Sequence, residues 1–145
     1  MISQRVTDGT SNWHVDLVPK TDNPPLLNII SWNIAGIKTK LSEPEWLKSI
    51  RGQDEILLQE TWETAPNFIK GYKNYYKAAI PSPAGRSSGG LLIWVRVDIN
   101  LEICSYLTNS PDILGIVLKT GAGERLLIMN VYNRSSRGNI ESDTL

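Results

Sequence analysis

The chain has 145 residues, of which 41% are hydrophobic and 21% are charged, and this composition suits one ordinary domain with a packed core. Lysine plus arginine and aspartate plus glutamate both number 15, so the chain lacks the overall basic surplus typical of nucleic-acid binders. The single cysteine, Cys104, excludes an internal disulfide framework and a thiolate metal site. No apolar run reaches the roughly 18 residues of a membrane span, and the first 20 residues lack the apolar stretch of a secretory signal. We therefore expect a soluble protein without a membrane partner, intracellular rather than secreted, in the nucleus or the cytoplasm.

The first 25 residues are polar and end in the pair Pro24-Pro25, which disfavours a helix before it. This composition predicts a flexible lead-in over residues 1–25. The ordered domain is predicted over residues 26–132, and a polar tail follows over residues 133–145.

The first part of the domain alternates strand and helix. Residues 26–32 are a short apolar run that predicts a strand, and residues 55–59 predict a second, buried strand. Between them, Ser42 and Glu45 have the spacing of a capping box, which predicts a helix that ends near Gly52. This order of elements favours an α/β fold.

From residue 72 onward the pattern is typical of strands only. Five are predicted, over residues 72–79, 90–97, 101–107, 113–119 and 125–132, with a loop at 85–90 and a hairpin link at 120–124. Such largely apolar strands need a covering layer that one helix cannot supply. The predicted fold is α/β, a partial two-sheet β-sandwich flanked by helices.

Polar side chains follow three of these strands. Asn33 and Glu60 come directly after the two strands that flank the helix, and Tyr132 ends the last one. Open α/β sheets collect their site residues at such strand ends. Taken singly, each residue has an ordinary structural role: Asn33 in a turn, Glu60 as a solvated turn or cap residue, and Tyr132 as a half-buried packing group. The informative feature is their occurrence together in this order.

These motifs resemble the endonuclease/exonuclease/phosphatase family, and in particular its branch of LINE-type retrotransposon endonucleases. The matching segments are Ser31-Trp32-Asn33, Leu58-Gln59-Glu60-Thr61, Gly89-Gly90-Leu91-Leu92-Ile93 and Asn130-Val131-Tyr132. The resemblance covers residues 26–132 and implies about the first half of a four-layer α/β sandwich. It also implies phosphodiester hydrolysis with Mg²⁺ or Mn²⁺, in which Glu60 binds the metal, Asn33 orients metal or phosphate, and Tyr132 contacts the scissile phosphate.

The chain departs from the family pattern at two points. Ala35 stands where some members carry an aspartate, and the family's later Asp-x-Asn and Ser-Asp-His motifs do not follow. The single histidine, His14, is expected to be a surface residue rather than a base. Because hydrolysis needs a group that takes the proton of water, we expect this N-terminal fragment to be inactive alone and to bind metal weakly. Its expected partners are the missing C-terminal half of the domain or, through exposed strands, further copies of itself.

A basic segment adds a nucleic-acid prediction. Residues 64–97 contain no acidic side chain but carry Lys73, Lys77 and Arg86 among several tyrosines, a combination that can bind phosphates and stack bases. We predict these three residues as DNA contacts. A strand with exposed lysines and inward-packed tyrosines explains the pattern equally well. The functional alternatives are a phosphatase or lipid-directed phosphodiesterase of the same fold, and a non-catalytic module that binds nucleic acid or a partner chain.

Overall fold

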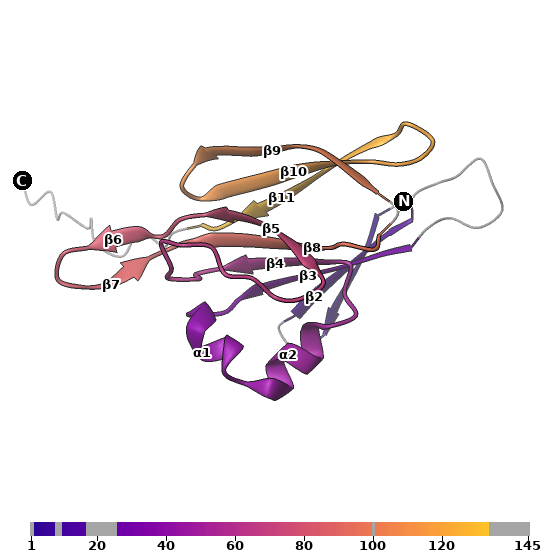
Figure 1. The fold of residues 1–145 in the computed structure, drawn as a ribbon. Helices are drawn as coiled ribbons and strands as arrows, with labels where there is room; N and C mark the ends of the chain where they lie inside the picture. Colours follow the sequence, from indigo (N-terminus) through magenta and orange to yellow (C-terminus); the bar gives the residue numbers. More distant parts are fainter. Residues whose placement is uncertain (1, 8–9, 17–25, 100, 134–145) are drawn as a thin grey trace, which may run out of the picture.

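Two β-sheets pack face to face, and two short helices cover the outer face of the larger sheet (Figure 1). The computed structural model describes residues 2–7, 10–16, 26–99 and 101–133, with side chains described over 27–99, 101–103 and 110–133. The six-stranded sheet has the order β1-β2-β3-β4-β8-β5, the three-stranded sheet has the order β11-β10-β9, and β6 and β7 form a separate pair. The elements are β1 (Ile2–Thr7), β2 (Thr10–Asp16), β3 (Leu26–Asn33), α1 (Ile37–Leu41), α2 (Pro44–Ile50), β4 (Glu55–Gln59), β5 (Tyr72–Lys77), β6 (Ile80–Ser82), β7 (Gly85–Ser88), β8 (Leu91–Arg96), β9 (Glu102–Ser110), β10 (Ile113–Lys119) and β11 (Arg125–Val131).

The apolar strands lie where the sequence predicts them. β4 and β10 have the predicted bounds, and β3, β5, β8, β9 and β11 differ from them by a few residues at their ends. The helical segment differs more, because it consists of two helices. Ser42 does not cap α2: its hydroxyl donates to the Thr39 carbonyl (2.6 Å) at the end of α1, and Glu43 precedes Pro44 as the N-cap residue.

The predicted flexible lead-in contains two strands. β1 pairs antiparallel with β2 and β2 with β3, so the hairpin extends the six-stranded sheet. The polar composition hides these strands, yet the sequence between the paired residues Thr7 and Thr10 is Asp8-Gly9, a dipeptide that favours two-residue hairpin connections. The rest of the lead-in, the tail from residue 134, and the side chains of His14 and Cys104 lie outside the described residues.

The predicted loop at residues 85–90 is also partly strand. β6 and β7 pair antiparallel, with Ile80 opposite Ser88, and form a short hairpin. Its strands are too short and too exposed to show the apolar alternation on which a strand prediction depends.

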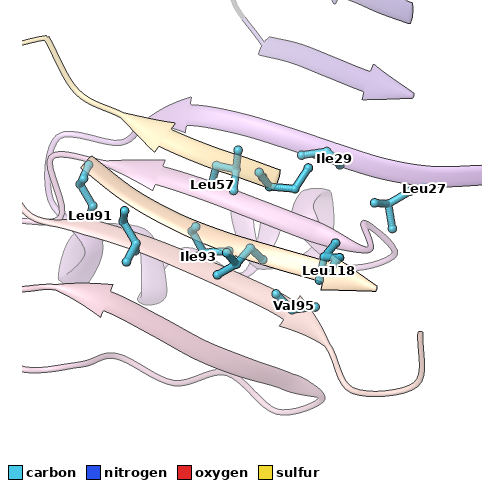
Figure 2. Packing of buried hydrophobic residues seen from close by; sticks show 10 residues of the cluster. Leu27, Ile29, Leu57, Leu91, Ile93, Val95 and Leu118 are labelled. Carbon is cyan, nitrogen blue, oxygen red and sulfur yellow. The ribbon is translucent and has the colours of Figure 1, made fainter. Parts of the chain in front are cut away.

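The main core lies between the two sheets (Figure 2). Alternate residues of β3, β4 and β8 point inward and meet β10 and β11; the fully or largely buried members are Leu27, Ile29, Leu57, Leu91, Ile93, Val95, Leu114, Ile116, Leu118 and Ile128. Burial of each such side chain contributes roughly 1.5–3 kcal/mol. This core fixes the two sheets against each other, and the candidate site lies where several of their strands end.

A second core lies between the six-stranded sheet and the helices. The alternate residues of the same strands, such as Leu58 and Trp94, pack there against Ile37, Trp46 and Ile50. β4 and β8 are therefore buried on both faces, which explains their continuous apolar sequences. The expected α/β arrangement of packed sheets with flanking helices is present in this coarse form. Over the described part of the chain, no helix is long and apolar enough to cross a membrane.

Candidate functional site

The topology brings the ends of three strands to one edge of the sandwich. β3 and β4 are parallel and Asn33 pairs with Gln59, so Asn33 and Glu60 lie at the same edge of the larger sheet. Tyr132 follows β11 of the smaller sheet, and its hydroxyl donates a hydrogen bond to Glu60 Oε1. The Glu60–Tyr132 contact therefore joins the two sheets at this edge.

Glu60 has an uncommon backbone conformation that accounts for this contact. Strict alternation after Ile56 and Leu58 would place its side chain on the face covered by helices. Its φ is +56°, in the left-handed region, so the alternation is broken and the carboxylate meets Tyr132 of the other sheet. Ala35 (+48°) and Trp62 (+62°) share this region, which costs a non-glycine residue roughly 1–2 kcal/mol. Such strain is typically concentrated at functional sites.

Neighbouring backbone holds the strained segment 60–62 from both sides. One side is the turn between β3 and α1, and the other is the segment that leads into β8. The hydrogen bonds run from Gly36 N to Glu60 O (2.8 Å), from Ile37 N to Thr61 O (3.0 Å), from Thr61 N to Gly90 O (3.3 Å) and from Trp62 N to Gly89 O (3.0 Å). The backbone around Glu60 is thus fixed before any ligand binds.

Two glycines permit this close packing. A Cβ on Gly36 would lie 2.8 Å from the Trp62 ring, and a Cβ on Gly90 would overlap the Thr61 hydroxyl. Both glycines also have positive φ, +105° and +90°. The glycines at these two sequence positions are therefore required by the turn that presents Glu60.

A buried amide network fixes the spacing of the sheets beside the site. Gln59 Nε2 donates to Asn130 Oδ1 (2.6 Å) and to Ser31 Oγ (3.0 Å). Asn130 Nδ2 donates to the carbonyls of Leu58 (2.9 Å) and Leu92 (3.0 Å). Because Gln59 precedes Glu60 and Asn130 lies two residues before Tyr132, the network positions both. Sequence reasoning gave no role to Gln59 or Asn130; the available signal was a polar residue at an inward position of an apolar strand.

The Glu60–Tyr132 contact forms part of a pocket of about 270 Å³. Its other walls are Trp62 and the β7 segment, including Arg86. The guanidinium of Arg86 lies 3.6 Å from the centroid of the Trp62 ring, a cation–π contact that holds the charge at the pocket. The predicted DNA contact Arg86 thus shares a pocket with Glu60 and Tyr132, and the Trp62 ring supports its guanidinium.

Asn33 lies beside the pocket but does not line it. Its side chain is exposed and has no hydrogen bond to the described residues. The amide is therefore available to a ligand.

The two predicted lysine contacts lie at different ends of β5. Lys77 pairs with Leu91, which in turn pairs with Gln59, so Lys77 lies at the edge of the sheet that carries Glu60. Lys73 pairs with Val95 near the opposite edge, so the structure does not bring it to the site.

The tyrosines of the basic segment divide between the two cores. Tyr75 packs against the core between the sheets, and Tyr72 packs against the core under the helices. For these two residues the packing interpretation holds. Tyr76 alone is exposed at 40%.

The pocket offers one carboxylate to a metal ion. Among the described residues, no three His, Cys, Asp or Glu side chains gather into a cluster. A protein commonly binds Mg²⁺ through only one or two carboxylates, with water and phosphate oxygens as the remaining ligands. Glu60 fits such a site as a single protein ligand. Asn33 and Arg86 supply hydrogen-bond donors for phosphate oxygens, and the one O–H of Tyr132 is used to hold the Glu60 carboxylate.

No protein-family model and no curated protein matches this chain.

Proposed function

We propose that the Glu60–Tyr132 pocket is the cation- and phosphate-binding part of a metal-dependent phosphodiesterase that acts on DNA, of the LINE-type endonuclease kind that the sequence motifs resemble. The observation that carries this proposal is the convergence of a carboxylate, a phenol and a guanidinium from separate strands in one pocket. The resemblance of the motifs supports it, because the motif residues form the contacts of the strained turn.

Each side chain has a role in this proposal. Glu60 would hold Mg²⁺ or Mn²⁺. When bound there, the ion would polarise a phosphoryl oxygen and stabilise the leaving oxygen. The Asn33 amide would donate to a non-bridging oxygen as negative charge develops there, and Tyr132, whose one O–H donates to Glu60, would orient the carboxylate toward the cation. Arg86 would bind the neighbouring backbone phosphate from its position on Trp62.

The described pocket residues include no group suited to be the base. Glu60, its one carboxylate, is assigned to the cation, and none of the residues that line the pocket is a histidine. We therefore propose that this chain binds DNA in a metal-dependent way without cutting it. The same proposal includes a fourth, helical layer over the three-stranded sheet, whose β11 exposes Leu127, Met129 and Val131.

The test is the binding of a fluorescent DNA duplex, measured by anisotropy with Mn²⁺ and with EDTA. We expect Mn²⁺ to tighten binding by about tenfold in the wild type and in the control variant Glu124→Gln, and not in Glu60→Gln. Equal metal dependence in Glu60→Gln would contradict the proposal. Incubation with supercoiled plasmid and Mg²⁺ tests the second part: nicking that disappears in Glu60→Ala would show that the chain is active alone.

A non-catalytic binding module is the second candidate, and the absence of a base in the described pocket favours it. A pure binding module has no need of a cation at Glu60. It would bind DNA equally with Mn²⁺ and EDTA, and Arg86→Ala would weaken binding while Glu60→Gln would not. The same titrations therefore separate the two candidates.

A further inference from the structure

A second pocket, of about 300 Å³, lies at the other end of β4 and β8. It is bounded by the segment after α2, the start of β5 and the end of β8, and its lining includes Arg51, Lys70, Tyr72 and Val97. Glu55 at the start of β4 pairs with Val95, whereas Gln59 at its end pairs with Leu91 beside the first pocket. The length of β4, roughly 15 Å, therefore separates the two pockets.

The carboxylates at this second pocket are already paired. Arg96 Nε lies 2.6 Å from Asp98 Oδ1, and Arg96 Nη1 lies 3.4 Å from Asp54 Oδ1. The other oxygen of Asp54 accepts a hydrogen bond from the backbone N–H of Asn28 (2.8 Å). These acidic groups are therefore held by Arg96 and by backbone.

Two further cations at the pocket have no such partner. Arg51 and Lys70 are exposed, and neither forms an ion pair with a carboxylate of the described residues. Free carbonyl oxygens at the end of α2 would repel an anion, but two of them already accept hydrogen bonds. Leu47 O accepts from Arg51 N (3.1 Å), and Ile50 O accepts from Gln53 N (3.2 Å). Arg51 and Lys70 thus have no carboxylate partner among the described residues, and the pocket carries a net positive charge that favours a phosphate monoester.

The remaining wall is apolar and open. The Tyr72 ring is fixed by a hydrogen bond from its hydroxyl to Gln53 O (2.8 Å), and Val97 is 56% exposed. A Cβ placed on Gly52 or Gly71 would meet no atom within 4 Å, so the space beside both glycines is free. An inorganic anion makes no use of an apolar wall, whereas the sugar and base of a nucleotide do, and the volume is at the small end of the range for such ligands.

We propose that this pocket binds the phosphate monoester of a nucleotide, with Arg51 and Lys70 on the phosphate and with Tyr72 and Val97 against the sugar or base. The monoester can belong to a free mononucleotide or to the 5′ end of an oligonucleotide. The proposal is independent of the metal-dependent site at Glu60.

Isothermal titration of the full chain with adenosine monophosphate tests the proposal. We expect saturable binding that inorganic phosphate reproduces more weakly and adenosine does not reproduce. Arg51→Ala and Lys70→Ala should each weaken it at least fivefold, because each removes a charge-assisted hydrogen bond. Lys48→Ala, which removes a cation of α2 outside the pocket, and Glu60→Gln should leave it unchanged.

A trinucleotide with a 5′ phosphate distinguishes the two sources. If it binds more tightly than adenosine monophosphate, the pocket takes nucleic-acid ends; if it binds more weakly, the pocket takes free nucleotides. No saturable binding, equal binding of adenosine, or full binding in both Arg51→Ala and Lys70→Ala would overturn the proposal. Because Glu60→Gln is the control here, failure of this proposal leaves the function proposed for Glu60 untouched.

Discussion

Among single residues, the two glutamates at the ends of β4 have opposite environments. Glu60 is half-buried at the edge of the sandwich and accepts a hydrogen bond from Tyr132. Glu55 is fully buried between the sheets, and neither of its carboxylate oxygens has a hydrogen-bond partner. The apolar sequence after Glu55 predicts the strand β4, but it does not show that the carboxyl group of Glu55 points into the core.

Burial raises the pKa of Glu55 from an ordinary 4.5 to about 8, and the charge of Asp54 adds to the effect. The folded protein therefore keeps this proton at pH values where the unfolded chain has lost it. The contribution of this proton to the free energy of unfolding is present in full below pH 4.5. It is lost as the pH rises to about 8, and the free energy of unfolding falls by roughly 1.4 kcal/mol per pH unit at most.

Urea unfolding from pH 5 to pH 8 checks this prediction. We expect the free energy of unfolding of the wild type to fall by a few kcal/mol across this range, and that of Glu55→Gln to fall much less. The exposed Glu124→Gln variant serves as the control and should follow the wild type. Parallel pH profiles for wild type and Glu55→Gln would contradict the account.

Among the elements, the turn after β4 shows what sequence reasoning could and could not predict. The apolar sequence of β4 predicts its bounds, and the order of strand, helix and strand predicts that Asn33 and Glu60 lie at one edge. The left-handed conformation of Glu60 depends on contacts with the β3–α1 turn and with Gly89–Gly90, which are distant in sequence. The Gln59–Asn130 network likewise joins residues of different sheets. No local pattern reports such pairings, although the conjunction of motifs indicated that the segments belong to one site.

Short polar strands were the other failure of sequence reasoning. β1, β2, β6 and β7 consist mostly of polar residues, so hydrophobic periodicity does not mark them, although each pairs with a neighbouring strand. The Asp8-Gly9 dipeptide was the one local signal for the first hairpin.

The turn gives a prediction at this scale. Gly90→Ala places a Cβ against the Thr61 hydroxyl at a φ of +90°, and we expect it to destabilise the fold by about 2–4 kcal/mol. It should also abolish the Mn²⁺-dependent part of DNA binding, because residues 60–62 must move. Gly121→Ala meets no atom within 4 Å and should change the unfolding free energy by at most about 0.5 kcal/mol. Equal stability of the two variants in chemical denaturation would show that the turn is not held as described.

At the scale of the whole molecule, the two faces of the sandwich are covered unequally. Helices α1 and α2 lie over the outer face of the six-stranded sheet (Figure 1). On the three-stranded sheet, the edge strand β11 exposes Leu127, Met129 and Val131 at 49%, 45% and 54%. An apolar row on an edge strand favours association.

We therefore expect the chain to self-associate in sedimentation velocity experiments as its concentration rises. The double variant Leu127→Thr, Met129→Thr should shift the distribution towards monomer, because it removes apolar surface from the row. Phe68→Ser, which removes an even more exposed aromatic ring (69%) outside this row, should not. A wild-type protein that stays monomeric at all concentrations would contradict this expectation. So would a Phe68→Ser variant that shifts the distribution as much as the double variant does.

The proposed function requires Glu60 to present its carboxylate to a divalent cation in the pocket that it shares with Tyr132 and Arg86. Anomalous diffraction from crystals soaked with Mn²⁺ and a short DNA duplex tests it most directly. We expect a manganese peak within about 2.5 Å of the Glu60 carboxylate, with a phosphate oxygen on its far side. Manganese bound only elsewhere, or a duplex phosphate seated in this pocket with no metal at Glu60, would contradict it.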